Sequence, residues 1–357
     1  MAKILILGAG IAGHTAASHL RRKLSKEHEV VVVSPNRNYQ WVPSNIWVGI
    51  GRMKSDEVFF PLEPLYKRKG IGYKQAKVIS FHPEGDATET KGFVTIEYIF
   101  GKNAGVQEKV NYDYLINATG PKLAFELTEG LNPGTNKAYS VCTYEHAAHA
   151  SEALLKLIGD IKTSDKKAKI LIGTGHAKAT CQGAAFEYIL NVEKELVRYG
   201  VRDKIELTWI SNENELGDFG MDGMLLTYGN QTLKSSELVE MVFADHGIKW
   251  ILGAGVFKID EGKAHYENLE GEYKEEDFDF AMLIPSFSGH GFKAFDKNEN
   301  DITDKLFKGF MIVDADYTSK PYEEWTVQDW PETYQNPNYA NIFAPGIAFA
   351  PPHNISK

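Results

Sequence analysis

The sequence predicts an α/β protein with two Rossmann-like, three-layer dinucleotide-binding domains, the first interrupted by the second and enlarged by β-meander insertions. A complete glycine motif at residues 8–13 and a degenerate one at 173–178 each lie between an apolar strand and a helix. Alternating strand-like stretches at 95–99 and 108–112 indicate the meander. The 357 residues are enough for two separate cores.

The expected domains are three segments of the chain. We expect the first part of the first domain at 1–135, the second domain at 136–280, and a return to the first domain at 281–357. The polar stretch 351–357 follows directly after an apolar strand. That order favours a chain that continues past Lys357.

Composition narrows the classes of function. A formal net charge of -9 and a pI near 5.7, without a Lys/Arg-rich cluster, argue against a nucleic-acid partner. No apolar run reaches the roughly 18 residues of a membrane span. A strand-like stretch follows Lys3 at once, so we expect no signal peptide. Cys142 and Cys181 stand too far apart for a C-x-x-C pair or a zinc knuckle, so we expect no metal site.

The motif at residues 8–13 is a complete G-x-G-x-x-G between a strand at 3–7 and a helix. Gly8 permits the turn, Gly10 lets the backbone approach a pyrophosphate, and Gly13 allows the helix to pack closely on the strand. The phosphates would lie at the positive end of the helix. This position in the chain predicts dinucleotide binding by the first domain.

The end of the next strand departs from the usual fingerprint. An acidic residue normally binds the ribose there, and Ser34 takes its place, followed by Pro35 and Asn36. A serine hydroxyl can still bond a ribose. The aromatic stretch 38–43 then reads either as a surface loop or as a flat-sided wall beside a cofactor.

The second glycine motif predicts a tight bend from the strand 168–172 into a helix, through Gly173 and Gly175. Lys178 stands where the third glycine belongs, and Cys181 follows three residues later. One interpretation is a loop that has exchanged cofactor binding for thiol chemistry, with the helix start favouring the thiolate. The other is a degenerate turn whose cysteine is a small packing residue.

In combination these motifs resemble the sulfide:quinone oxidoreductases, a branch of the two-dinucleotide flavoprotein disulfide reductases that is related to the flavoprotein subunit of flavocytochrome c sulfide dehydrogenase. The resemblance runs through the whole chain in order. It is carried by Gly8 to Gly13, Ser34, Ala118-Thr119-Gly120-Pro121-Lys122-Leu123, Ser140-Val141-Cys142, His146, Cys181 with Gly183, Ala185 and Glu187, and Asn341-Ile342-Phe343 with Gly346.

The resemblance implies FAD, covalently or non-covalently held, in the first domain and a second domain that no longer binds NAD. Sulfide would be oxidised through cysteine sulfur and a persulfide, and electrons would leave to quinone. It also implies peripheral membrane association, on a side left open, through a C-terminal segment outside these residues. A homo-oligomer is compatible with it.

The implied site residues fall into two groups. The catalytic ones are Cys181, Cys142, His146 and Glu187, although His146 could instead cap or pack its helix and Glu187 could be a solvated helix residue. The cofactor-binding ones are Gly8, Gly10, Ile11, Ala12, Gly13, Ser34, Pro35, Asn36, Pro43, Val78, Ala118, Thr119, Gly120, Pro121 and Gly346.

The chain departs from the family pattern at two positions within the sequence. Ala348 replaces the family's other redox cysteine, and Asp218 stands where relatives often place a histidine. Pairing of Cys142 with Cys181 stays open, since a disulfide needs Cα atoms within about 7 Å. Two other functions also stay open: a type-II NADH:quinone reductase, and an FAD-binding sulfur carrier that has lost turnover.

Overall fold

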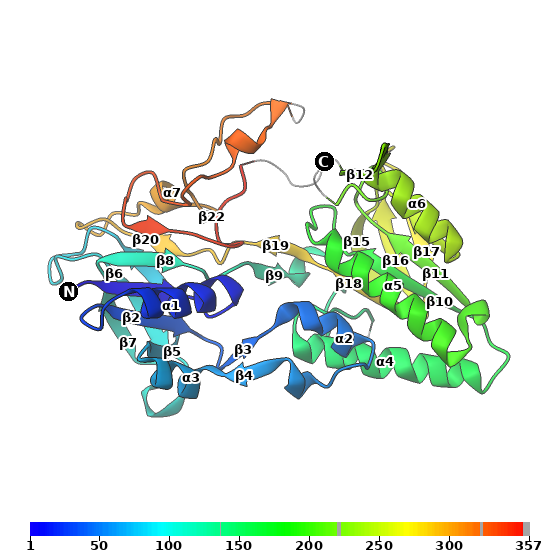
Figure 1. Cartoon of the computed structure of the whole chain (residues 1–357), viewed down its shortest axis with the longest axis horizontal. Coiled ribbons are helices and arrows are strands. Elements are labelled where there is room, and N and C mark those ends of the chain that lie inside the picture. The colour runs from blue at the N-terminus through cyan, green and yellow to red at the C-terminus, as the bar shows by residue number, and fades with distance from the viewer. Residues whose placement is uncertain (136, 220–222, 322–323, 353–357) are drawn as a thin grey trace. The chain divides into compact units, whose positions relative to one another are not determined.

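The computed structural model describes residues 1–135, 137–219, 223–321 and 324–352, and these form two compact units (Figure 1). Unit 1 comprises residues 1–40, 59–122 and 288–352, and unit 2 comprises 41–58 and 123–287. The predicted class, with a first Rossmann-like sheet interrupted by a second, is confirmed. The boundaries between the two compact units differ from the expected domain limits at 135 and 280. The expected functional domains stay a prediction.

Unit 1 is built on one mixed sheet. Parallel pairing joins its first five strands, and β6 and β7 add antiparallel to β5 as the predicted meander. The order is β23 (Ile342–Phe343), β8 (Tyr114–Asn117), β1 (Lys3–Leu7), β2 (Glu29–Ser34), β5 (Gly72–His82), β6 (Phe93–Tyr98) and β7 (Gln107–Asn111), with β20 (Lys293–Ala294) also on β5. Helix α1 (Ile11–Lys23) follows β1, as predicted, and α3 (Leu62–Lys69) precedes β5.

The central strands of unit 1 are buried on both faces, and alternate residues enter two different cores. Leu5, Leu7 and Val31 join one core with the meander. Ile4 and Ile6 join the other, which includes residues of α1 and α3. Continuous apolar runs at 4–7 and 30–33 follow from burial on both sides.

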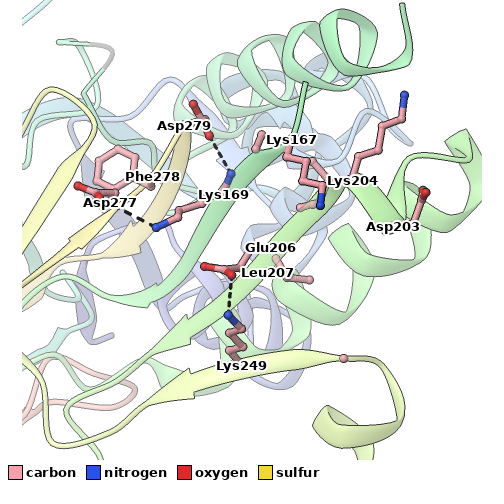
Figure 2. Close-up of a pocket in the computed structure, with 13 residues that line it drawn as sticks. Lys167, Lys169, Asp203, Lys204, Glu206, Leu207, Lys249, Asp277, Phe278 and Asp279 are labelled. Carbon is pink, nitrogen blue, oxygen red and sulfur yellow. Dashed lines mark hydrogen bonds and ion pairs between the residues drawn. The ribbon is translucent and has the colours of Figure 1, made fainter. Parts of the chain in front are cut away.

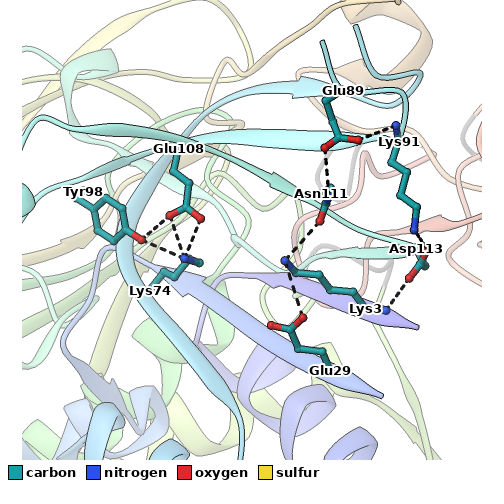
Figure 3. Close-up of polar contacts among 9 residues, drawn as sticks. All are labelled: Lys3, Glu29, Lys74, Glu89, Lys91, Tyr98, Glu108, Asn111 and Asp113. Carbon is teal, nitrogen blue, oxygen red and sulfur yellow. Dashed lines mark hydrogen bonds and ion pairs between the residues drawn. The ribbon is translucent and has the colours of Figure 1, made fainter. Parts of the chain in front are cut away.

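Polar side chains connect strands of this sheet (Figure 3). The ammonium of Lys74 on β5 contacts the carboxylate of Glu108 on β7 at 2.9 Å and the hydroxyl of Tyr98 on β6 at 3.1 Å. The Lys3 amide donates to Asp113 at 2.7 Å. These groups are partly solvated, so they fix strand register more than they add stability.

Unit 2 has a four-stranded parallel sheet in the order β14 (Ile248–Ile251), β11 (Ile205–Ile210), β10 (Ala168–Thr174) and β18 (Phe280–Ile284). Its helices are α4 (Tyr144–Lys162), α5 (Gln182–Tyr199) and α6 (Ser235–Asp245). A separate antiparallel sheet comprises β15 (Gly255–Asp260), β16 (Lys263–Glu267) and β17 (Tyr273–Asp277). Within the described ranges, no helix has the length and apolar character needed to cross a bilayer.

The sequence alone predicts an amphipathic helix at 233–246 and a strand at 248–256 in unit 2, and both predictions are wrong in extent. The strand expected at 248–256 is interrupted, because Gly253 turns the chain with a φ of +60° between β14 and β15. The helix expected at 233–246 begins at Ser235, because Gln231–Lys234 (β13) pairs with Leu225–Tyr228 (β12) in a hairpin. Residues 220–222 of the glycine-rich loop before this hairpin, and 353–357 of the polar end, lie outside the described residues.

The aromatic stretch expected as a loop is mostly ordered structure. Residues 38–43 contain β3 (Asn38–Gln40) and the start of a short 3-10 turn (Val42–Ser44), and α2 (Asn45–Gly49) follows directly. Helix α2 is fastened within unit 2: the buried Asn45 amide donates to the Val141 carbonyl at 3.0 Å, and the Tyr188 hydroxyl donates to the Gly49 carbonyl at 3.0 Å. The segment 41–58 is therefore part of unit 2.

Candidate functional site

The first glycine loop is folded tightly on the chain around it. Gly8 has a φ of +94°, and a Cβ placed on it would lie 2.2 Å from the carbonyl oxygen of Ala118. A Cβ on Gly13 would lie 2.1 Å from the carbonyl oxygen of Gly8. Both positions exclude any side chain, as the motif predicts.

Gly10 differs from its two neighbours in the motif. No described atom lies within 4 Å of the position that its Cβ would take. It precedes the first residue of α1, where no described side chain caps the helix and the first turn has no acidic residue. Free backbone N–H groups beside open space suit the pyrophosphate of a dinucleotide.

Other expected cofactor-binding residues surround this loop within unit 1. A Cβ on Gly346 would lie 3.0 Å from the Ala12 Cβ, and Ala118 packs on Gly8. Ile11 is 44% exposed and Ile347, beside Gly346, is 60% exposed. Exposed apolar side chains near the open space beside Gly10 suit a flat ring. Ile347 was missed from the sequence, where an isoleucine near a strand end carries no distinguishing signal.

The remaining expected cofactor residues have local roles in the structure. Ser34 is buried at the end of β2, and its hydroxyl accepts a hydrogen bond from the Asn36 amide at 3.2 Å, which leaves its own hydrogen to donate. Thr119 donates to Asn117 at 2.8 Å. Val78 lies at a bulge in β5. Pro35, Pro43 and Pro121 have some exposure, and cofactor contact by this group stays a prediction.

The second glycine loop has its corresponding space filled. A Cβ on Gly173 would lie 1.7 Å from the Ile210 carbonyl oxygen, which reflects close packing of β10 on β11. A Cβ on Gly175 would lie 2.6 Å from Leu131 Cδ2 and 3.1 Å from the Leu283 Cβ. The position equivalent to Gly10 therefore faces packed leucine side chains and offers no room for a pyrophosphate.

The tight bend predicted after Gly175 is wrong. Strand β10 ends at Thr174, but α5 begins only at Gln182. The intervening loop is held by Asn212, whose amide nitrogen donates to the carbonyls of Ala177 at 2.8 Å and Ala179 at 3.0 Å. Gln182 in turn donates to the Asn212 side-chain oxygen at 3.1 Å. A distant side chain thus fixes a longer path into the helix.

Cys181 and Cys142 are free thiols that approach the carboxyl end of β18 from its two sides. Tyr139, just before Cys142, forms a parallel bridge with Met282 of β18. On the other side, the Ser286 hydroxyl donates to the Lys178 carbonyl, in the loop that leads to Cys181, at 3.2 Å. Both cysteines pack against the same core of unit 2. The structure therefore brings the two expected thiols into one region.

The helix start favours a Cys181 thiolate, as expected, but burial has the larger effect on this thiol. Cys181 is the residue directly before α5, but burial raises its pKa, and the opposing effect of the Ala184 amide is smaller. Burial raises the pKa of Cys142 to about 12, with Ser140 opposing and Cys181 adding to the rise. Both groups are protonated thiols at neutral pH, because desolvation outweighs the helix dipole.

His146 and Glu187 differ in their surroundings. The His146 amide donates to Thr143, which caps α4, while its Nδ1 is buried without a hydrogen-bond partner among the described residues. The ring meets Phe125 edge-on at 5.5 Å, and burial lowers its pKa. Glu187 is exposed on α5. The catalytic role of either residue stays a prediction.

Glu213 is a buried acid that sequence reasoning missed. It lies beyond the end of β11 with 2% exposure, and burial raises its pKa to about 7. The nearby Asp218, where relatives often place a histidine, adds to this rise and is itself 9% exposed. Glu213 stands in a polar, loop-like stretch, so the sequence carries no sign of its burial.

A hollow of about 660 Å³ lies at the other end of the unit 2 sheet (Figure 2). It is bordered by the amino ends of β10, β11 and β18, where lysines and acids pair: Lys249 with Glu206 at 2.5 Å and Lys169 with Asp277 at 4.0 Å. In parallel sheets, ligands bind at the carboxyl ends of strands, where the glycine and cysteine loops lie. This hollow is not the candidate site.

Known proteins share this organisation. Residues 2–185 match the family described as pyridine nucleotide-disulphide oxidoreductase. The sulfide-quinone reductase of Aquifex aeolicus is 29% identical over 99% of this chain and 70% of its own. The crystal structure of the sulfide:quinone oxidoreductase from that organism matches with a TM-score of 0.77 and 28% identity, covering 98% of this chain and 69% of that one.

A more distant match is a type II NADH:quinone oxidoreductase of Staphylococcus aureus, 22% identical over 58% of this chain and 48% of its own. It covers a smaller part of both chains than the Aquifex protein does. The family match spans more than half of the chain and includes both glycine loops and both cysteines. The chain belongs to the pyridine nucleotide-disulphide oxidoreductase family.

Proposed function

We propose that this chain is an FAD-dependent oxidoreductase that oxidises sulfide to sulfur or polysulfide and passes the electrons to quinone. The contrast between Gly10 and Gly175 carries the proposal: one glycine faces open space and the other faces packed leucines. This contrast supports a dinucleotide site at the first glycine loop and disfavours one at the second glycine loop. The similarity to sulfide-quinone reductase along 99% of the chain supports the same substrates.

FAD would be held by the first glycine loop, by the 118–121 turn and by Gly346, with its pyrophosphate beside Gly10. When bound, it supplies a two-electron acceptor. The open side chains of Ile11 and Ile347 would contact apolar parts of the cofactor. The chain itself would bind the phosphates through backbone N–H groups and would place apolar side chains beside them.

The sulfur chemistry would involve Cys142 and Cys181. Sulfide attacks a disulfide between them and gives a persulfide on one cysteine and a thiol on the other. A second sulfide removes the outer sulfur as hydrodisulfide, and reoxidation of the two thiols releases two electrons and two protons. The net change is 2 HS⁻ → HS₂⁻ + H⁺ + 2 e⁻. This pairing would serve in place of the family's cysteine at position 348, where Ala348 is 3% exposed in unit 1.

His146 is a candidate for handling these protons, because burial lowers its pKa and leaves a neutral imidazole at pH 7, whose Nδ1 has no hydrogen-bond partner within the described part of the chain. Peripheral membrane attachment remains part of the proposal, since quinone is a lipid-soluble acceptor. A homo-oligomer also remains part of the proposal. The side of the membrane is left open.

Anaerobic reduction tests the function. Sulfide should bleach the flavin absorption band of the purified protein, NADH should not, and a soluble quinone analogue should restore the band. Cys181→Ala and Cys142→Ala should retain bound flavin but lose sulfide bleaching by at least about 100-fold, and His149→Ala on the same helix as His146 is the control. Bleaching by NADH alone would contradict the proposal and favour a type-II NADH reductase. No bleaching by either would favour an FAD-binding sulfur carrier without turnover.

A further inference from the structure

Asn212 is a buried residue that follows β11 within two positions, in a different segment from the loop that leads to Cys181. We propose that Asn212 is a positioning residue that holds Cys181 in place for sulfur exchange with Cys142. This inference rests on the proposed function, in which these two cysteines form a disulfide. It concerns the arrangement of the thiols and not contact with sulfide or with the cofactor.

The side chain of Asn212 contacts the loop at three places. Its amide nitrogen donates to the carbonyl of Ala177 at 2.8 Å and to the carbonyl of Ala179 at 3.0 Å. Its amide oxygen accepts a hydrogen bond from the side chain of Gln182 at 3.1 Å. Both N–H groups and the oxygen of one amide are thus used on a single loop. The last of these contacts is made by the residue that directly follows Cys181 in the chain.

The asparagine extends from a rigid part of unit 2. Its backbone amide donates to the hydroxyl of Thr174, the last residue of β10, at 3.1 Å. The neighbouring Ser211 is fixed on both sides, because its amide donates to the Ile251 carbonyl at 2.9 Å and its carbonyl accepts from the Ala254 amide at 2.8 Å. A side chain with such a support can define the position of the loop that it contacts.

Gln182 transmits this constraint to the thiol. Its amide nitrogen also donates to the carbonyl of Ala179 at 3.1 Å, so the chain closes on itself from Ala179 to Gln182 with Cys181 inside the closed segment. The Gln182 Oε1 atom is buried without a hydrogen-bond partner among the described residues. An unsatisfied buried oxygen costs stability, so the contacts of the amide nitrogen keep the glutamine in this place.

Cys142 is held by other residues. Its amide donates to the Ser140 hydroxyl at 3.1 Å, and the carbonyl of the preceding Val141 accepts from the Asn45 amide at 3.0 Å. These partners lie outside the second glycine loop. A disulfide forms only when the two Cα atoms lie within about 7 Å and the sulfurs are suitably directed. Removing the asparagine should therefore displace the sulfur of Cys181 and leave the sulfur of Cys142 in place.

The first test compares the labelling of the two thiols by iodoacetamide at pH 7.5 in the reduced, folded protein. Asn212→Ala removes the three side-chain contacts and should label Cys181 at least about 10-fold faster, because a freed loop hydrates the thiol, with Cys142 within about 2-fold. Gln182→Met removes the glutamine contacts together with the unpartnered oxygen, so it tests the same constraint with a smaller loss of stability. It should accelerate Cys181 several-fold. Asn191→Ala, which removes one amide contact to a carbonyl of its own helix α5, is the matched control and should change neither rate.

The second test measures the pairing by titration with reduced and oxidised glutathione, in which oxidised glutathione takes up the two electrons and two protons of the thiols. The equilibrium constant for the Cys142–Cys181 disulfide should fall about 10-fold in Asn212→Ala, which corresponds to roughly 30 mV in reduction potential. A purely structural role would lower the resistance to urea without this change.

Equal labelling rates and equal disulfide constants in the unmodified chain and both variants would overturn the inference. Equal acceleration of Cys142 and Cys181 would also overturn it, because it would show a general loosening of unit 2. Failure of the unmodified chain to form the disulfide would instead overturn the sulfur chemistry of the proposed function.

Discussion

The carboxylate of Glu213 accepts a hydrogen bond from the Phe219 amide at 2.5 Å, and Phe219 has a left-handed φ of +51°. Its second oxygen accepts from the Ser211 hydroxyl at 2.7 Å. A left-handed conformation is uncommon for an aromatic residue, and this one is held by a buried acid. The carboxyl group of Glu213 therefore joins two parts of the loop beyond β11.

This carboxyl group should make the stability of the protein depend on pH. Burial raises its pKa to about 7, above the value of 4.5 expected in the unfolded chain, so folding favours the protonated form. Its contribution is complete below about pH 4.5 and is lost as the pH rises through 7. When the pH rises from 5.5 to 8, ionisation of this group alone should lower the free energy of unfolding by about 2 kcal/mol.

Urea unfolding at the two pH values checks this expectation. Glu213→Gln keeps an oxygen for the Phe219 amide but cannot ionise, so it should remove most of the difference. The exposed Glu187→Gln serves as a matched control on α5 and should leave the difference unchanged. An unaltered pH dependence in Glu213→Gln would show that the acid is ionised at all these pH values.

Gly10→Ala should separate cofactor binding from folding. No described atom lies near the added methyl group, so the free energy of unfolding of the apoprotein should change by less than about 0.5 kcal/mol. A bound pyrophosphate would meet that methyl group, and FAD affinity should fall at least about 10-fold. Calorimetry of the apoprotein and fluorescence titration with FAD measure the two quantities.

Gly183→Ala is the matched control for this substitution. Gly183 lies in the first turn of α5, and its Cβ position is also free of described atoms within 4 Å. The change should add up to about 1 kcal/mol of stability, because alanine favours a helix, and should leave FAD binding unchanged. If Gly10→Ala binds FAD as tightly as this control does, the pyrophosphate does not lie beside Gly10.

The first domain could be predicted because its signals are local. The strand at 3–7 has the predicted bounds, and a helix, α1, follows the glycine motif as predicted. Burial on both faces gives continuous apolar runs, and the turn itself favours glycine through the φ of +94° at Gly8 and the close approach of Gly13 to the Gly8 carbonyl. The meander at 93–111 followed from strict alternation, with errors of one or two residues at its ends.

The conformation of the second glycine loop and the filling of the space beside Gly175 could not be predicted, because both depend on residues distant in sequence. Gly175 has the same residue type as Gly10, but Leu131 fills the space beside it from another segment. Asn212 then holds the loop to Cys181 in a longer path. The protonation of the thiols likewise depends on burial, which the sequence does not show. A cysteine at a helix start, taken alone, indicates a thiolate.

Substitutions at the filled loop should therefore destabilise the protein. Leu131 is 2% exposed, and Leu131→Ala should lower the free energy of unfolding by about 3 kcal/mol. Gly175→Ala places a methyl group 2.6 Å from Leu131 and should also be destabilising, unlike Gly10→Ala. NADH fluorescence should show no binding by Leu131→Ala, since Asn212 still holds the loop. Binding of NADH by this variant would mean that the leucine alone excludes the nucleotide.

The two thiols should react slowly with alkylating reagents at neutral pH, because only the thiolate is a nucleophile. Iodoacetamide labelling, followed by mass spectrometry of the reduced, folded protein, should accelerate about 10-fold per pH unit from 7 to 9 without a plateau. Cys181 should react before Cys142, whose pKa is raised to about 12. The urea-unfolded chain is the control and should label both at the rate of an ordinary cysteine.

Sulfide-dependent chemistry must then begin from the oxidised pair or from a loop opening that hydrates the thiols, because buried neutral thiols are poor nucleophiles. Labelling separates these two routes. If an added disulfide oxidant such as diamide protects both cysteines, and sulfide then restores labelling of one as a thiol and of the other as a persulfide that is heavier by one sulfur, the Cys142–Cys181 disulfide is the starting state. Rapid labelling of Cys181 at pH 7 in the reduced, folded protein would contradict its raised pKa and support a thiolate that attacks directly.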